Sequence, residues 1–162
     1  GTGLLPSPTV EEFTAKGGWW VVAQGLLLAA LLAAWLLWGG GWEVAAVAGG
    51  AALTGAGGAL GAAGFLALGH AVTPSPEPLA GAALVERGAY RLARHPIYGG
   101  IVLGCAGVSL ADGNWPGLVL ASALAGLFRA KAGFEEKRLG ARYPGYDAYR
   151  VRVPRSLIPW LL

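Results

Sequence analysis

Charged residues are scarce in this chain of 162 residues: Asp, Glu, Lys and Arg make up 13 % of it, against roughly 25 % in a typical soluble domain. Hydrophobic residues make up 55 %. The composition therefore excludes an ordinary water-soluble domain and predicts an integral membrane protein. The first apolar run begins only at Trp19, lasts about twenty residues and is followed by further apolar segments, so no secretory signal peptide is expected.

Residues that form disulfides or bind metals are equally few. The single cysteine, Cys105, cannot form an internal disulfide, and because it lies in an apolar run we expect a small buried side chain. The sequence has no cluster of His, Cys and Asp residues spaced like metal ligands, so no metal site is expected. Methionine is absent and the first residue is Gly1, which favours removal of an expression tag and predicts no structural role for the first few residues.

Positive charge is concentrated in the C-terminal half. Eleven of the twelve Lys and Arg residues lie between Arg87 and Arg155. Nucleic acid is one partner for a basic surface, but these cations flank hydrophobic segments, so the positive-inside rule explains them more simply and no nucleic-acid binding is expected. The bias predicts that residues 72–96 and 129–155 face the cytoplasm together with both termini.

Four apolar segments predict an all-α, polytopic membrane bundle of about four transmembrane helices. The first covers residues 19–38 with tryptophans at both ends, and the second covers about 44–71 with eight glycines. Small residues let helices pack closely in lipid, so we interpret the glycines as a packing surface, with room for a ligand as the alternative. The third, residues 97–111, is short for a full span. The fourth opens at Trp115 and continues past Leu127 into water.

These segments predict a single membrane domain over residues 1–162. Residues 1–71 form an N-terminal helix pair and residues 72–96 a cytosolic loop. Residues 97–134 form a helical hairpin, and residues 135–162 a cytosolic C-terminal segment of helix and loop. Within the loop, residues 73–78 include three prolines and predict a stiff polar linker. His70 is expected to be a capping or interfacial residue, and Arg129 and Lys131 to mark the membrane interface.

The most informative stretch joins a cation-rich loop to the third apolar segment. It contains Arg94-His95-Pro96, and proline presets its own backbone for the first helical position while pushing the preceding residue towards an extended conformation. We therefore predict a sharp loop-to-helix corner at Pro96. Unpaired amide hydrogens at such a helix start favour anions and polar ligands beside Arg94 and His95.

Four short motifs follow one another in the C-terminal half: Gly88-x-Tyr90, Arg94-His95-Pro96-x-Tyr98-x-Gly100, Glu135-Glu136-x-x-Leu139 and Tyr146-x-x-Tyr149-x-x-Arg152-x-Pro154. Their order, with a helical hairpin between the second and third, resembles the isoprenylcysteine carboxyl methyltransferase family and the related phospholipid N-methyltransferases over residues 84–160. The first two spans match only as generic hydrophobic helices. The resemblance implies an integral membrane enzyme that uses S-adenosylmethionine and releases S-adenosylhomocysteine. It also implies contact with membrane lipids and a lipophilic substrate that enters the site sideways from the bilayer.

The resemblance also implies roles for individual residues in a pocket at the cytosolic face. The expected cofactor-binding residues are Tyr90, His95, Tyr98, Glu135, Glu136 and Leu139. Arg94 and Arg152 match family positions near the substrate's carboxylate, which a guanidinium can hold through two parallel hydrogen bonds. If the substrate were an amine, Glu136 would accept the proton that methylation releases, and the predicted catalytic set is Arg94, Arg152 and Glu136.

The complete arginine-histidine-proline motif favours a carboxylate acceptor of isoprenylcysteine type, small or prenylated. The alanine- and arginine-rich composition is typical of bacteria, so we expect the inner membrane and a small lipophilic acid, thiol or lipid as substrate. A phospholipid or amine N-methyltransferase of the same family stays open, as does an NADPH-dependent reductase of the steroid 5α-reductase type. A non-catalytic scaffold would explain only the glycine-rich segment.

Each motif also has a simpler interpretation. Glu135 and Glu136 could pair with Arg138 or other neighbours along one helix, contributing only about 0.2–0.5 kcal/mol per pair. Tyr146 and Tyr149 could be anchors in the aromatic belt at the membrane interface. The structure decides between these interpretations by showing which side chains the four motifs contact.

Overall fold

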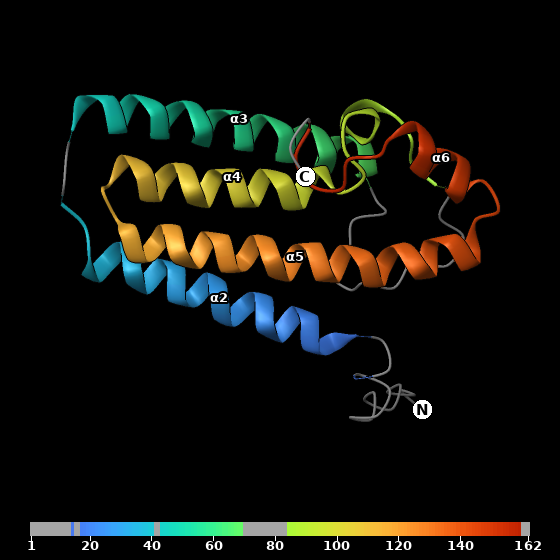
Figure 1. Ribbon diagram of the computed structural model, residues 1–162, viewed down its shortest axis with the longest axis horizontal. Coiled ribbons are helices and arrows are strands. Elements are labelled where there is room, and N and C mark those ends of the chain that lie inside the picture. The colour runs from blue at the N-terminus through green and yellow to red at the C-terminus, as the bar shows by residue number, and fades with distance from the viewer. Residues whose placement is uncertain (1–13, 15–16, 41–42, 70–83, 160–162) are drawn as a thin grey trace, which may run out of the picture.

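The computed structural model describes residue 14 and residues 17–40, 43–69 and 84–159, and every regular element among them is helical. The helices are α2 (Gly18–Leu37), α3 (Val44–Leu68), α4 (Pro96–Ala111), α5 (Trp115–Arg142) and α6 (Tyr146–Arg152), with a 3₁₀ helix η2 (Gly88–Arg91) before α4. The four longest run side by side along the molecule (Figure 1). The predicted all-α bundle is confirmed. His70 and the proline linker at 73–78 lie outside the described residues.

Within the described residues, three helices are long and apolar enough to cross a membrane: α2, residues Ala46–Leu68 of α3, and α5. α4 is apolar but has 16 residues, fewer than the roughly 20 that a full span needs. Large apolar side chains are exposed on the surface of the bundle: Leu36 is 76 % exposed, Val44 87 % and Leu66 76 %. Such a surface belongs in lipid, so the chain is an integral membrane protein. The expectation of four full spans is not confirmed beyond these three.

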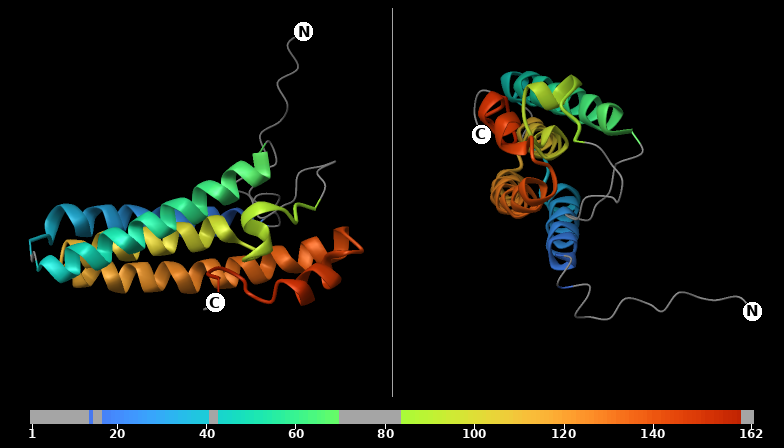
Figure 2. Two further views of the ribbon diagram at one scale, coloured as in Figure 1. Left: turned by 90° about the horizontal axis from the view of Figure 1, so that it is seen from above. Right: turned by 90° about the vertical axis from the view of Figure 1, so that its right-hand side faces the viewer.

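The helices pack in the spatial order α3, α4, α5, α2. The end-on view in Figure 2 shows α2 set against α5 and apart from α3. Backbones of α3 and α4 approach closely because glycines face one another there: a Cβ on Gly57 would lie 2.6 Å from the carbonyl oxygen of Gly100, and one on Gly64 would lie 3.0 Å from the side chain of Pro96. The interpretation of the glycine-rich segment as a packing surface is confirmed for Gly57 and Gly64, whereas nothing lies within 4 Å of a Cβ on Gly55 or Gly58.

A core of apolar side chains lies between α2, α4 and α5. Leu31, Leu124 and Phe128 are fully buried in it, and Cys105 joins them as the sequence predicted. The turn from α4 to α5 is fixed by Asn114, whose Oδ1 accepts a 2.8 Å hydrogen bond from the first turn of α5 while Nδ2 donates to the carbonyl of Ala34 on α2. One side chain thus caps α5 and ties it to α2.

Segments far apart in sequence meet at the end of the bundle opposite this turn. η2, the start of α4, the last turns of α5 and α6 gather there (Figure 1). The tail after α6 folds back over the corner: the amide of Arg94 donates to the carbonyl of Arg155 at 3.0 Å, and that of His95 to Ser156 at 2.7 Å. Gly99 permits this approach, since a Cβ there would collide with the carbonyl oxygen of Leu157.

Candidate active site

The loop-to-helix corner forms where the sequence predicted it. Pro96 is the first residue of α4, His95 precedes it as N-cap, and the side chains of Arg94 and His95 are buried. A buried guanidinium or imidazolium loses its hydration and is stable only with close anionic or accepting partners. The partners of these two residues therefore define the site.

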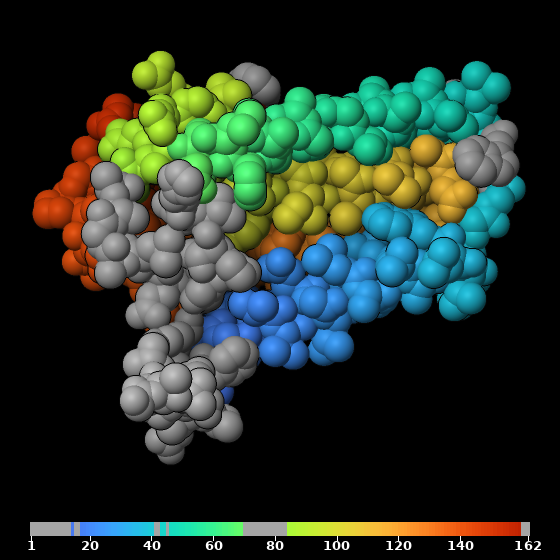
Figure 3. Space-filling view, turned by 180° about the vertical axis from the view of Figure 1, so that it is seen from behind, coloured from blue at the N-terminus to red at the C-terminus, as the bar shows by residue number. Residues whose placement is uncertain are grey.

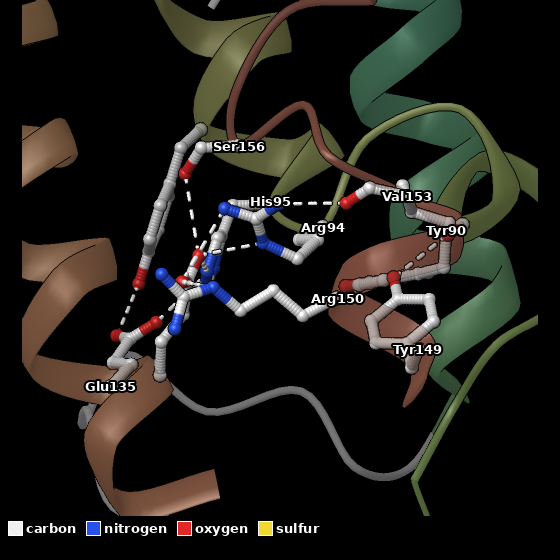
Figure 4. A network of polar contacts seen from close by, with 10 residues as sticks. Tyr90, Arg94, His95, Glu135, Tyr149, Arg150, Val153 and Ser156 are labelled. Atoms are coloured by element: carbon white, nitrogen blue, oxygen red, sulfur yellow. Dashed lines mark hydrogen bonds and ion pairs between the residues drawn. The ribbon is translucent and has the colours of Figure 1, made fainter. Parts of the chain in front are cut away.

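Arg94 binds Glu136 through two hydrogen bonds. Its Nε donates to Oε1 at 2.9 Å and its Nη2 to Oε2 at 3.3 Å, while Nη1 donates to the carbonyl of Val153 at 2.6 Å (Figure 4). α5 runs unbroken through Glu135 and Glu136, as expected for a helix that continues beyond its apolar part. Glu136 is therefore bound by a residue outside its own helix, and the guanidinium of Arg138 lies over the ring of Phe134.

His95 lies between the two carboxylates. Its Nε2 is 3.2 Å from Oε1 of Glu136, and its Nδ1 is 3.4 Å from Oε2 of Glu135. Burial alone lowers the pKa of His95, but hydrogen bonds and negative charge from both glutamates outweigh it and raise the pKa above its ordinary value of 6.5. When His95 is protonated, its charge and that of Arg94 balance the charges of the two carboxylates.

Tyrosines surround this cluster. The hydroxyl of Tyr98 donates to Oε1 of Glu135 at 2.6 Å, and its ring stacks between His95, at 5.6 Å, and Phe128, at 4.5 Å. Tyr90 is half-buried, and burial followed by the negative charge of Glu135 raises its pKa to about 12. Its backbone carbonyl accepts a 2.7 Å hydrogen bond from Tyr149 (Figure 4). Tyr98 thus holds Glu135 by a hydrogen bond, and Tyr90 is a neutral hydroxyl group near it.

The C-terminal motif forms a second small cluster that supports the first. Tyr146 and Tyr149 of α6 are each 2 % exposed and pack with Val153, and Leu139 lies against them. Burial raises the pKa of both tyrosines. They are packed inside the protein rather than displayed in an aromatic belt. Leu139, expected to line the cofactor pocket, lies in this supporting cluster.

Arg152 is not brought to the buried cluster. It lies on the exposed side of α6 and pairs with Glu86, whereas Arg150, 61 % exposed, has its Nε 4.0 Å from Oε2 of Glu136. Of the predicted site residues, the structure gathers Arg94, His95, Tyr98, Glu135 and Glu136 in direct contact, with Tyr90 beside them. The catalytic role of Arg152 stays a prediction.

Two further residues escaped the sequence interpretation. Ser156 turns its hydroxyl towards Oε1 of Glu136 at 3.5 Å, and nothing in the sequence marks it. Lys131, expected to mark the membrane interface, is 1 % exposed, so its side chain lies inside the protein. The apolar run that precedes Lys131 in the sequence was the one sign that its side chain could be buried. In the parts of the chain that the structure describes, no group of three or more His, Cys, Asp or Glu side chains is arranged to hold a metal ion.

Comparison with protein families gives a match that agrees with the fold. The model of the family described as phospholipid methyltransferase matches residues 45–144, more than half of the chain. The match covers α3, the corner at Pro96, α4 and α5 with the glutamate pair, and it leaves out α2 and α6. Searches of the curated proteins and of the solved structures gave no match.

Proposed function

The chain belongs to the phospholipid methyltransferase family, a family of membrane methyltransferases, and from this we propose that it transfers a methyl group from S-adenosylmethionine to a lipophilic acceptor. One observation carries the proposal. The glutamate pair of α5 is held at the loop-to-helix corner by Arg94, His95 and Tyr98. Arg94 also donates to the carbonyl of Val153, and Tyr149 donates to that of Tyr90, so four motifs that are separate in sequence share one end of the bundle. A purely structural helix pair would not need two buried carboxylates there.

The donor set fits the chemical groups of this cofactor. S-adenosylmethionine needs carboxylates for its ammonium group or ribose hydroxyls, hydrogen-bond donors for its carboxylate, and apolar surface for adenine. Glu135 and Glu136 supply the first, and His95, Tyr90 and Tyr98 supply the second. The third falls to Leu139 and its apolar neighbours.

When bound, the cofactor would supply an activated methyl group on a sulfonium: a lone pair of the acceptor would attack the methyl carbon and displace the thioether, which keeps the electrons of the broken S–C bond. The protein's part is to position the reactants and to keep water out. Arg94, His95 and Glu136 are at most 9 % exposed, so the site is held in a nearly dry and fixed environment. No side chain needs to form a covalent intermediate.

Two acceptors are compatible with this chemistry. The arginine-histidine-proline motif favours a carboxylate acceptor of isoprenylcysteine type. Arg94 already binds Glu136 and Val153, so the oxygens of such an acceptor would have to replace Glu136 on Arg94. The second candidate is the amine of a phospholipid, which needs no arginine. That engagement of Arg94, together with the family description, favours the amine.

A methyl-transfer assay tests the proposal and separates the two acceptors. Detergent-purified protein is incubated with methyl-labelled S-adenosylmethionine and either S-farnesylcysteine with a free carboxylate or phosphatidylethanolamine. Label released by alkali as volatile methanol identifies a methyl ester, and alkali-stable label in lipid identifies an N-methyl product. Transfer to neither acceptor, with oxidation of NADPH on addition of a lipid enone, would overturn the proposal in favour of a reductase.

The site is proposed to face the cytoplasm of a bacterial inner membrane. The cations of Arg91, Arg138, Arg142, Arg150 and Arg155 all belong to segments at the end of the bundle where η2 and α6 lie (Figure 1). The positive-inside rule assigns such an end to the cytoplasm. A cytosolic site is also where a water-soluble cofactor is available.

A further inference from the structure

Tyr146 carries a buried hydroxyl to which the proposed methyl transfer gives no role. The residue is 2 % exposed, and among the described residues its hydroxyl has no hydrogen-bond partner. This is unusual, because a buried polar group without a partner is costly and most are hydrogen-bonded. Packing with Tyr149 and Val153 holds the ring in place. The hydroxyl is therefore fixed in position with its donor and acceptor capacity unused.

Charged groups of the candidate active site surround this hydroxyl. Burial contributes most to raising the pKa of Tyr146, the negative charge of Glu136 raises it further, and the positive charges of Arg94 and Arg150 lower it. These three charges therefore lie within electrostatic reach of the hydroxyl. Arg94 is bound to Glu136, which leaves Arg150 as the cation whose role at this position is unexplained.

Arg150 lies on the same face of α6 as Tyr146. It follows Tyr146 by four residues, a spacing that places two side chains next to each other on a helix. Its Nε is 4.0 Å from Oε2 of Glu136, which is too long for a hydrogen bond. Figure 4 shows the side chain extending from α6 towards the corner residues. A guanidinium and a hydroxyl of one short helix are thus both close to Glu136.

Arg152, the arginine of the C-terminal motif, is directed elsewhere. It comes two residues after Arg150, and residues two apart on a helix do not share a face. Its guanidinium pairs with Glu86 instead. The motif therefore marks one arginine of α6, whereas the structure directs the other one to the site.

The donors expected to hold the carboxylate of the cofactor are already engaged. Both ring nitrogens of His95 face carboxylates, and the hydroxyl of Tyr98 donates to one of them. Tyr90 lies where the negative charge of Glu135 acts on it, which is unfavourable for a second anion. The hydroxyl and the guanidinium on α6, by contrast, make no hydrogen bond within the described part of the chain.

Together, Glu136 and Arg150 match the two opposite charges of an amino acid. Oε2 of Glu136 accepts a 3.3 Å hydrogen bond from Arg94 and has a further lone pair, while Arg150 is 61 % exposed. An ammonium group and a carboxylate on one carbon atom can contact both side chains at once. α6 lies at the outer surface of its end of the bundle (Figure 3), where a water-soluble ligand has access.

We propose that Arg150 and Tyr146 bind the carboxylate at the amino-acid end of S-adenosylmethionine. The guanidinium and the hydroxyl donate to its oxygens, and Oε2 of Glu136 accepts from its ammonium group. Rotation of the exposed Arg150 side chain admits the ligand to the hydroxyl. This inference rests on the proposed function and adds that recognition of the amino-acid end depends on Arg150 rather than on Arg152.

Two ligands that differ only in this carboxylate test the inference. Detergent-purified protein is titrated calorimetrically with S-adenosylhomocysteine and with its decarboxylated analogue, S-adenosyl-3-thiopropylamine. Wild-type protein is expected to bind S-adenosylhomocysteine at least about tenfold more tightly, because the analogue cannot form the charge-assisted hydrogen bonds. Arg150→Met should reduce this preference to about threefold or less. Arg152→Met, which breaks an exposed ion pair, should keep the full preference.

A matched pair of tyrosine variants separates binding from packing. Tyr146→Phe removes a hydroxyl that has no partner among the described residues, so the Tm of the ligand-free protein should stay the same or rise. Its preference for S-adenosylhomocysteine should fall by roughly threefold to tenfold. Tyr149→Phe removes a hydroxyl that donates to the carbonyl of Tyr90, so its Tm should fall while the preference is kept.

Several results would overturn the inference. These are a full preference in Arg150→Met, an equal loss of preference in Arg150→Met and Arg152→Met, and an unchanged preference with a lowered Tm in Tyr146→Phe. Equal affinity of the wild-type protein for the two ligands would also overturn it, and would favour an anionic group of the acceptor as the ligand of Arg150. Failure of both ligands to bind the folded wild-type protein would instead contradict the proposed function.

Discussion

Arg94 and His95 depend on a carboxylate that lies 42 and 41 residues further along the chain. Their contacts with Glu136 close the corner onto α5, and removing one partner of a buried charged pair typically costs about 3–5 kcal/mol. Variants of these residues therefore change stability as well as ligand binding. Any measurement of cofactor affinity at this site needs a parallel measurement of unfolding.

Protonation of His95 is expected to make the stability of the protein depend on pH. Its pKa is raised in the folded protein, so the stabilisation is fully present below the ordinary value of 6.5 and is lost as the pH rises through the folded pKa. The groups facing it are Glu135 and Glu136 from α5 and the ring of Tyr98 from α4. Thermal unfolding in detergent should show the Tm falling as the pH is raised above 6.5.

His95→Gln provides the comparison for this prediction. Glutamine can still donate a hydrogen bond to Glu136 but carries no titratable proton, so the Tm of this variant should change much less over the same pH range. A wild-type profile as flat as that of His95→Gln would show that His95 is not protonated in the folded protein.

Individual site residues could be identified from sequence only through their motifs. Glu135, Glu136, His95 and Tyr98 were expected near one another because the four motifs resemble a known order, and they do meet. Which cation pairs with which anion depends on how α5 is rotated relative to the corner, and sequence spacing does not fix that rotation. For the same reason the burial of Lys131 was missed.

At the scale of helices, the contact between α3 and α4 depends on which glycines face inward. Gly57 faces the backbone of α4, where a Cβ would lie 2.6 Å from an oxygen, whereas nothing lies within 4 Å of a Cβ on Gly58. Gly57→Ala should therefore destabilise the protein by roughly 1–3 kcal/mol through overpacking. Gly58→Ala, on the lipid-facing side, should be neutral or slightly stabilising, since alanine favours helix.

Denaturant titration of detergent-solubilised variants measures this difference. Both substitutions add the same methyl group to adjacent positions of one helix, so propensity and expression effects cancel in the comparison. Equal stability of Gly57→Ala and Gly58→Ala would mean that the two helices are not packed as closely as described.

Helices were the part of the fold that the sequence predicted best. Long apolar runs bounded by glycine and proline residues predicted α2, α3 and α5 to within a few residues, and Pro96 predicted the start of α4. The short helix α6 and its fold-back over the corner were not predictable in detail. They depend on contacts of Tyr146 and Tyr149 with distant segments rather than on local periodicity.

At the scale of the whole molecule, the two ends of the bundle are expected on opposite sides of the membrane. Glu43 lies at the start of α3, and Asp147 lies in α6 at the other end (Figure 1). In a background with Cys105→Ala, Asp147→Cys should react with a membrane-impermeant maleimide only from the cytoplasmic side, and Glu43→Cys only from the opposite side. Labelling of both from one side would rule out this topology.

Calorimetric titration with S-adenosylhomocysteine tests most directly whether the end of the bundle around Glu135 and Glu136 binds the cofactor. Wild-type protein should bind one equivalent saturably, and Glu136→Gln should weaken binding at least about tenfold while Lys137→Ala, an exposed change on the same helix, leaves it intact. Thermal unfolding of each variant confirms that it is folded under the conditions of the titration. Absence of saturable binding by the folded wild-type protein, with binding of NADPH in its place, would contradict the assignment.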